Sequence, residues 1–298
     1  MGLAPIAMLF ATGAAWGLTL PLIRVAVSTG HQPLGIVLWQ KVIMAAMLGA
    51  LSWAMRLHRP FATRQLGLFA GVAVFGAILP GYFSYLTAAE LPAGVRAIIL
   101  AIVPMFALPM ALALGFERPQ ARRALGVVLG AAAITAIALP GAGPSRIELG
   151  IIALALIAPL SYAIEASFLA WRGSDGLHPF QLLLGASLVG IVLTWPLAAA
   201  TGQTVDLGRA WGAAEWAILA SGVLNALAYS GYVWLVSCAG SVFASQIAYL
   251  VTGFGVLWSM LLLGERYSLW VWLGCGLMLA GVALIQPLKK KAVIPEPV

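Results

Sequence analysis

Ten apolar stretches separated by short polar breaks constrain this chain more than any other feature of its sequence. A helix needs about 20 apolar residues to cross the hydrocarbon core of a bilayer, and most of these stretches approach or exceed that length. The stretches are far longer than the strands of a membrane barrel and show no alternating pattern. The sequence therefore predicts an all-α integral membrane protein with ten transmembrane helices. The predicted helices cover residues 4–27, 33–55, 66–88, 93–115, 124–139, 149–171, 179–199, 213–236, 242–263 and 269–287.

The composition supports a membrane protein and argues against several other classes. The chain is 62% hydrophobic and 8% charged, whereas soluble domains carry about 25% charged residues. Its net charge of +7 does not indicate a nucleic-acid partner, because the basic residues are spread over short breaks without an aromatic-interleaved patch. Cys238 and Cys275 form no disulfide framework, and no His/Cys cluster has metal-site spacing. No metal or cofactor is expected.

The distribution of basic residues predicts the orientation. Ten spans place both termini on the same side of the membrane, and residues 1–24 lack the features of a cleaved signal, so they are interpreted as a retained first helix. With a cytoplasmic N-terminus, the inner segments hold ten of the 16 Lys and Arg residues, including Lys289–Lys291, and the outer segments hold five. Because inner loops are enriched in Lys and Arg, both termini are predicted to be cytoplasmic, with residues 289–298 as a cytoplasmic tail.

The two halves of the chain repeat each other. The pair Tyr82 and Tyr85 recurs 147 residues later, the pair Glu117 and Arg118 recurs 148 residues later, and Trp16 aligns with a tyrosine 146 residues on. Several matches with small drift indicate a duplication. Each half holds five spans, an odd number, so the second half must be inverted relative to the first. We predict repeats at residues 1–143 and 144–288, a plan that recurs in secondary transporters.

These features resemble the EamA family of the drug/metabolite transporter superfamily over nearly the whole chain. The resemblance rests on the two five-helix halves, on Pro33 and Lys41 in the second span, and on Glu-Arg turns after the fourth and ninth spans. It implies a bacterial inner-membrane carrier or exporter of small metabolites, often amino acids. Family members commonly have an arginine early in the second span. Lys41 replaces it here, and its compact ammonium weakens the case for bidentate carboxylate recognition at this position.

Polar, aromatic and charged side chains within the predicted helices are the candidate substrate-binding residues, because such groups usually face a bundle interior or a cavity. Aromatic walls with a few hydroxyls and amides suit a semi-apolar molecule with one polar end. Two other roles stay open, which are anchoring at the membrane interface and hydrogen bonding between helices. The candidates are Trp16, Thr19, Gln40, Lys41, Tyr82, Tyr85, Tyr162, Glu165, Asn225, Tyr229, Gln246 and Tyr249.

Two charges fall well within predicted spans. Lys41 is suited to attract a carboxylate, and Glu165 is suited to bind a substrate ammonium or to carry a coupling proton. Alternatively, each side chain extends to the nearer membrane interface. Because a helix rises about 1.5 Å per residue, the two residues should lie well apart in depth and should not pair directly.

The remaining charges near span ends are interpreted as structural. Arg24, Glu90 and Arg96 are expected to be surface charges at one end of the bundle. Glu117 and Glu265 begin the turns before the fifth and tenth spans, where the helix dipole favours a carboxylate.

Proline and glycine predict bends and close packing. Prolines should bend three spans, the third at Pro80, the fourth at Pro104 and Pro109, and the sixth at Pro159. Small residues should bring the fifth and tenth spans close together as a scaffold, which leaves open a homodimer face there. These small residues are Gly126, Gly130, Gly274 and Gly281.

Together these patterns predict a secondary transporter that exports small metabolites, namely amino acids or related zwitterionic or aromatic compounds, by alternating access, with proton coupling left open. One alternative is a carrier of phosphorylated or nucleotide-linked sugars, although such anions need more cations than Lys41 alone. Another is a non-transporting membrane protein. An intramembrane enzyme is disfavoured, because no span contains histidine and Ser161 near Glu165 is the one faint nucleophile candidate.

Overall fold

The computed structural model describes residues 3–57, 61–138, 149–206, 208 and 210–285, without the side chains of residues 241 and 242. These residues are helical, with no strand among them. Several residues used in the sequence analysis lie outside this part of the chain, as does the predicted tail at 289–298. They are Lys289–Lys291 and three of the other basic residues counted for the orientation, namely Arg59, Arg146 and Arg209.

The ten predicted spans are confirmed, although three of them are built from more than one helical segment. Eight spans are long and apolar enough to cross a membrane, and the last two helices are shorter but also apolar. In the first half the elements are α1 (Leu3–Val27), α2 (Pro33–Ala54), η1 (Thr63–Gln65), α3 (Leu66–Ala73), the π-helical η2 (Val74–Ile78), α4 (Leu79–Ala88), α5 (Ala93–Leu100), α6 (Val103–Ala113) and α7 (Ala121–Ala138). In the second half they are α8 (Leu149–Arg172), α9 (Pro179–Ala200), α10 (Ala213–Ala239), α11 (Ser241–Ala244), α12 (Ile247–Leu263) and α13 (Leu269–Ile285).

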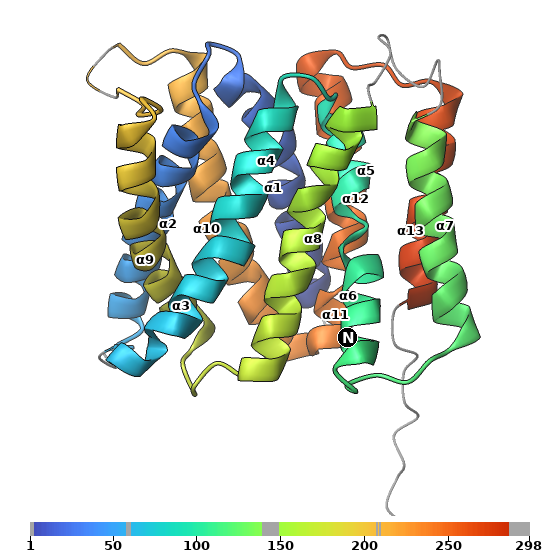
Figure 1. The fold of residues 1–298 in the computed structure, drawn as a ribbon, viewed down its shortest axis with the longest axis horizontal. Coiled ribbons are helices and arrows are strands. Elements are labelled where there is room, and N and C mark those ends of the chain that lie inside the picture. The colour runs from blue at the N-terminus through green and yellow to red at the C-terminus, as the bar shows by residue number, and fades with distance from the viewer. Residues whose placement is uncertain (1–2, 58–60, 139–148, 207, 209, 286–298) are drawn as a thin grey trace, which may run out of the picture.

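The second half is inverted relative to the first. α1 begins at the edge of the helical layer marked by the N-terminus and runs to the opposite edge, whereas α8, which opens the second half, runs the other way (Figure 1). The end of α13 returns to the edge where α1 begins. Helices of the two halves pack against each other in pairs, with α1 against α10, α2 against α9, and α7 against α13. The core is therefore shared between the repeats.

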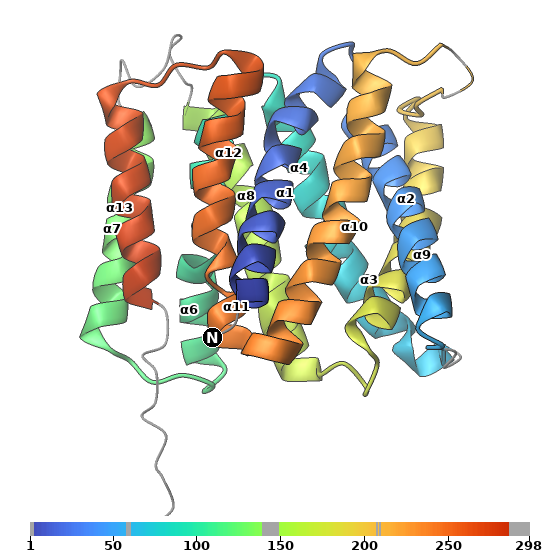
Figure 2. The same cartoon turned by 180° about the vertical axis from the view of Figure 1, so that it is seen from behind.

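The pairs α7–α13 and α2–α9 occupy opposite ends of the molecule, and both views agree on this (Figures 1 and 2). A β-carbon at Gly126 would lie 2.7 Å from the carbonyl oxygen of Gly281, and one at Gly274 would lie 2.8 Å from Ile137 Cγ1. Glycine is needed at these positions because any side chain would push the helices apart. The predicted close packing of these two spans is confirmed, and the homodimer face stays a prediction.

Two of the four prolines predicted to bend spans coincide with a departure from regular α-helix, whereas Pro109 lies inside α6. Pro104 is the second residue of α6, directly after the break at residues 101–102, and Pro80 is the second residue of α4, directly after η2. Proline cannot donate a backbone hydrogen bond, so it is tolerated at the start of a helical segment. Pro159 differs, because it lies inside α8, which is assigned as one helix throughout.

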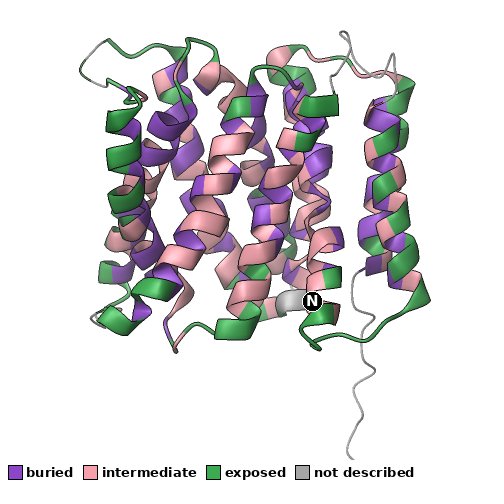
Figure 3. Ribbon diagram, in the orientation of Figure 1, coloured by how far each residue is buried: buried purple, intermediate pink, exposed green. Residues whose placement is uncertain are grey.

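Apolar side chains also cover the outside of the bundle. Val192, Trp195 and Leu261 are each more than 60% exposed, as expected for side chains that face lipid. Towards the middle of the molecule, α4 and α8 carry many partly exposed residues (Figure 3).

Candidate functional site

A cavity of about 920 Å³ lies between the two halves. Residues of α1, α2, α4, α5 and α6 line it from the first half, and residues of α8, α9, α10 and α12 line it from the second. The volume is in the range of sites that hold small organic molecules. Nine of the twelve predicted binding residues line this cavity: Trp16, Thr19, Gln40, Lys41, Tyr85, Tyr162, Glu165, Asn225 and Tyr229.

The other three predicted residues lie outside the cavity lining. Tyr82 packs against the cluster of Leu34 and Leu38, and Tyr249 packs against the core cluster between α5 and α13. Gln246 precedes α12 at its N-cap position. Helical spacing predicted a cavity position for all three, but Tyr82 and Tyr249 pack against apolar clusters instead.

Lys41 and Glu165 both face the cavity, and each packs against a glycine. An added β-carbon at Gly76, in η2, would lie 2.6 Å from the carboxyl carbon of Glu165, and one at Gly190 would lie 3.2 Å from Lys41 Cδ. The two charges act on each other electrostatically. As expected, no direct ion pair joins them in the described structure. The glycines thus leave room for the two charged groups at the cavity wall.

Aromatic rings and amides complete the wall. The rings of Trp16 and Tyr232 lie 6.1 Å apart, as do those of Tyr229 and Tyr232, so three rings from α1 and α10 form one surface. Gln40 Nε2 donates to Ser221 Oγ at 2.8 Å, which links α2 to α10 and holds the amide at the cavity edge. These fixed groups suit a ligand with an apolar body and polar ends.

At one end the cavity extends to an ion pair that the sequence analysis missed. Glu117 Oε2 lies 2.7 Å from Arg123 Nη1, and both side chains line the cavity. Glu117 is 40% exposed, so this end meets solvent. We call the pair of Glu117 and Arg123 the Glu117 end. Glu117 lies in the turn before the fifth span, as predicted, and its oxygen pairs with a guanidinium in the first turn of α7. The sequence signal for this ion pair was the presence of two opposite charges six residues apart across a turn.

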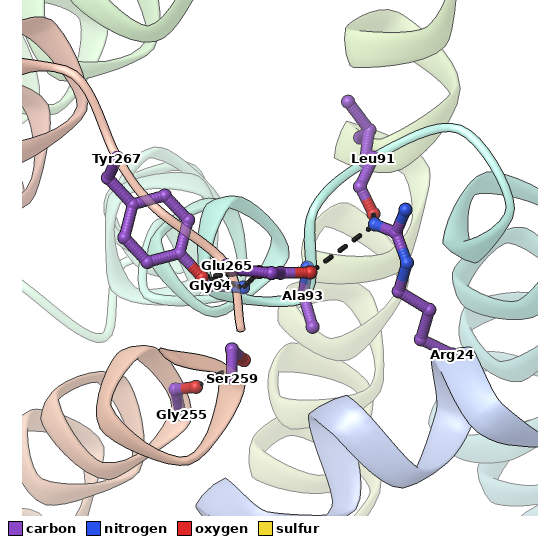
Figure 4. A network of polar contacts seen from close by, with 8 residues as sticks. All are labelled: Arg24, Leu91, Ala93, Gly94, Gly255, Ser259, Glu265 and Tyr267. Atoms are coloured by element: carbon purple, nitrogen blue, oxygen red, sulfur yellow. Dashed lines mark hydrogen bonds and ion pairs between the residues drawn. The ribbon is translucent and has the colours of Figure 1, made fainter. Parts of the chain in front are cut away.

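At the opposite end of the bundle, Glu265 joins the two halves through a network of polar contacts (Figure 4). Its Oε1 accepts a hydrogen bond from the backbone N–H of Ala93 at 2.8 Å and pairs with Arg24 Nη1 at 3.3 Å. Its Oε2 accepts from the N–H of Gly94 at 3.2 Å and from the hydroxyl of Tyr267. We call this group, together with Leu91, the Glu265 end.

Two sequence interpretations are corrected at the Glu265 end. Glu265 does sit at a helix start, but the helix is α5 of the other repeat, not α13. Leu91 accepts a further hydrogen bond from Arg24 at 2.9 Å, so Arg24 is part of this contact. Burial and the hydrogen bond to Glu265 raise the pKa of the Tyr267 hydroxyl well above its usual range, which keeps it a donor.

Arg96 was also misread as a surface charge. It is 3% exposed, whereas Glu90 is exposed as expected. In the sequence, Arg96 lies three residues into a span, so its side chain was expected to reach the membrane interface. The packing of α5 against its neighbours, which buries the side chain, cannot be predicted from that position.

The fold and cavity together define a multi-pass membrane protein built from two inverted repeats around a central, ligand-sized space, which is the architecture of secondary transporters. The sequence pattern of the EamA-like transporter family matches residues 3–139 and 149–286. The chain belongs to this family, which is part of the drug/metabolite transporter superfamily. The family pattern therefore occurs twice, once in each half of the chain.

Solved structures support the same fold. Twenty-five chains of solved structures match. One of them, described only as the crystal structure of a protein, has a TM-score of 0.62 and 15% sequence identity, over 95% of this chain and 96% of that chain. At this identity the likeness shows the fold alone. Among curated proteins, no sequence matches this chain.

Proposed function

We propose that the chain exports small metabolites across the bacterial inner membrane, and that its cargo is an amino acid or a related zwitterionic or aromatic compound. The observation that carries this proposal is the presence of Lys41 and Glu165, from opposite repeats, in one cavity with aromatic walls. A zwitterion offers one partner to each charge, and an apolar side chain would rest on the rings of Trp16, Tyr229 and Tyr232.

The unlike ends of the cavity support transport by alternating access. The Glu265 end joins α1 and α5 of the first repeat to the loop before α13, whereas the Glu117 end contains a partly exposed ion pair. With the predicted orientation the Glu117 end is cytoplasmic, so this conformation receives cargo from the cytoplasm. In the outward-facing conformation the two repeats exchange their arrangements, and the Glu265 end opens.

Glu165 is our candidate for the coupling proton. Its carboxylate lies at a low-dielectric wall beside Gly76 and faces Lys41 across the cavity. Protonation would remove one of the two charges that hold a zwitterion, so proton binding and cargo binding would affect each other through this site.

Transport in liposomes tests the function. Purified protein in proteoliposomes would be loaded with labelled amino acids, with sugar phosphates as the comparison class, and given a pH gradient. We expect flux of at least one amino acid and none of the sugar phosphates. Oriented protein that moves no member of either class would overturn the proposal, and flux of sugar phosphates alone would favour the other carrier function.

Variants near Glu165 test the site and the coupling separately. Glu165→Gln should abolish flux driven by the pH gradient and retain exchange of cargo between the two sides. Gly76→Ala should reduce both the driven flux and the exchange, because the added β-carbon would displace the carboxylate of Glu165. Gly67→Ala is the matched control, since nothing lies within 4 Å of a β-carbon there. Driven flux unchanged in Glu165→Gln would remove the proton role while leaving the transport proposal intact.

A further inference from the structure

Arg96 carries a buried guanidinium that the fold leaves uncompensated. The residue is 3% exposed, and its Nη1 and Nη2 atoms have no hydrogen-bond partner in the described structure. A guanidinium without a partner is costly to bury, and in a membrane protein such a charge marks a functional group more often than a structural one.

Nearby groups do not neutralise this charge. The carboxylate of Glu265 is within electrostatic range of Arg96, and so is the guanidinium of Arg24, which repels it. Both oxygens of Glu265 are already engaged by the N–H groups of Ala93 and Gly94. Arg96 therefore has the capacity to bind a further anion.

The guanidinium borders a void that adjoins the central cavity. This void has a volume of about 10 Å³, roughly the space of one water molecule. Ser84 and Leu100 line both the void and the central cavity. Leu100 is the last residue of α5, directly before the break at residues 101–102, so its side chain can move without distorting a continuous helix. Displacement of these two side chains would join Arg96 to the cavity.

A second donor, the hydroxyl of Tyr85, lies within electrostatic range of Arg96. The hydroxyl of Tyr85 is buried without a hydrogen-bond partner in the described residues, with Ser221 beside it, and Tyr85 also lines the central cavity. Its hydroxyl and the guanidinium of Arg96 act on each other electrostatically. A guanidinium and a phenol offer several N–H and O–H donors, and a carboxylate, which only accepts, is the group that such a pair binds best.

We propose that Arg96 is a second anion-binding group of the transport pathway, beyond Lys41, and that it takes the carboxylate of the cargo once Ser84 and Leu100 are displaced, with the Tyr85 hydroxyl as a second donor. This inference rests on the proposed function and deepens it by naming a carboxylate as an obligatory part of the cargo. Lys41 cannot provide planar, bidentate recognition of a carboxylate. The proposal assigns this recognition to Arg96, which lies on a different helix.

The site also connects cargo to the closed end. Arg96 lies about one turn after Ala93 and Gly94, whose N–H groups hold Glu265. A carboxylate bound at Arg96 places a second negative charge close to Glu265, which weakens the hold of α5 on that residue. Binding of the cargo would thereby favour opening of the Glu265 end.

Thermal unfolding with matched probes tests the proposal. The melting temperature of the purified protein would be measured without ligand, with benzoate, and with benzamide, which has the same shape but no charge. The variants are Arg96→Met, which removes the charge and keeps the length, and Arg172→Met, the same change at an exposed ion pair with Asp175. We expect benzoate to stabilise the wild type more than benzamide does. In Arg96→Met the apparent affinity for benzoate should fall by about tenfold or more, a difference of about 1.4 kcal/mol, while Arg172→Met retains it.

The melting temperature without ligand gives a second readout. If Arg96 had only a structural role, its replacement would lower this temperature, whereas the proposal predicts a rise. Arg96→Met without ligand should melt higher than the wild type, because an uncompensated charge has been removed. If it melts lower, Arg96→Lys decides, and the proposal stands only if this variant recovers part of the benzoate effect. Equal effects of benzoate and benzamide on the wild type, or full benzoate affinity in Arg96→Met, would overturn it. These melting experiments do not measure flux in liposomes. A failure of the Arg96 proposal can therefore be distinguished from a failure of the proposed function.

Discussion

Glu265 and Glu117 occupy equivalent positions in the two repeats, yet their surroundings differ. Glu265 is 11% exposed and receives hydrogen bonds from two backbone N–H groups, a hydroxyl and an arginine. Glu117 is 40% exposed and pairs with Arg123 of its own repeat. The first carboxylate joins the two halves of the molecule, and the second joins two turns of one half.

The difference shows that repeats of common origin adopt unlike conformations in one structure. The position in the second repeat that corresponds to Ala93 and Gly94 lies near the start of α11, the short segment before the break in the ninth span. If the repeats exchange arrangements, Glu117 should gain the contacts that Glu265 loses. Four sets of variants test how the two carboxylates differ.

Removing the two carboxylates should have unequal costs. Glu265→Ala leaves the first N–H groups of α5 and the guanidinium of Arg24 without their partner, so it should lower the free energy of unfolding by about 3 kcal/mol. Glu117→Ala leaves the guanidinium of Arg123, which is 8% exposed, without its partner, but the carboxylate itself is 40% exposed and makes one contact, so the cost should be smaller, about 1 to 2 kcal/mol. Denaturant unfolding in the same detergent measures both. Equal costs would mean that the closed end does not depend on Glu265.

Weakening the Glu265 end should expose the cavity from that side. In a background with Cys238→Ser and Cys275→Ser, Ala97→Cys introduces a thiol at a buried cavity position. We expect an impermeant maleimide added at the Glu265 side to react about tenfold faster when Glu265→Gln is also present, which corresponds to a shift of about 1.4 kcal/mol between conformations.

The matched thiol is Ala111→Cys on α6, which lines the cavity in the direction of Glu117. Its reaction from the Glu117 side should not increase with Glu265→Gln. Parallel increases at both positions would indicate general loosening of the fold and would contradict an exchange between two ends.

The Tyr267 hydroxyl should contribute about 1 kcal/mol, as a typical hydrogen bond does. Tyr267→Phe removes its bonds to Glu265 and to the N–H of Gly94. The pKa of this hydroxyl is raised by burial and by Glu265. Its contribution is therefore complete below about pH 10, the value of an unfolded tyrosine, and is lost as the pH rises further. Melting curves of variant and wild type should converge above that pH, and a constant difference would contradict the prediction.

Arg24 should contribute least to the Glu265 end. Its side chain is 36% exposed, and its nitrogen lies 3.3 Å from Glu265. Arg24→Met should therefore cost less than about 1 kcal/mol, and the cost should shrink further as salt is added. A large, salt-independent loss would mean that the arginine, and not the backbone of α5, is the main partner of the carboxylate.

Much of the architecture followed from local patterns. Span length and the odd number of spans per half predicted the inverted repeats, and Pro80 and Pro104 marked two interruptions because proline removes a backbone donor wherever it lies. Helical spacing also predicted that Trp16, Asn225 and Tyr229 line the substrate site, and all three line the cavity. Because such features depend on a few neighbouring residues, they can be predicted without the tertiary structure.

Other parts of the site depend on contacts between distant residues. The pairing of Glu265 with Ala93 joins positions 172 residues apart, and no periodicity in the sequence specifies which helix start a carboxylate will reach. The burial of Arg96 depends in the same way on how α5 packs against α12, α1 and α8, which the position of an arginine within a span does not reveal.

The amino-acid sequence by itself determined the number of membrane crossings, the inversion of the second half, and the two charges, Lys41 and Glu165, that are placed within spans. Three features appear only in the folded protein: those charges share a cavity, Glu265 joins the two repeats while Glu117 pairs within its own, and the terminal nitrogens of Arg96 are buried without a hydrogen-bond partner among the described residues. Crossing a bilayer is a requirement that each segment meets with its own residues, whereas a closed end or a buried charge exists only in the packing of one repeat against the other.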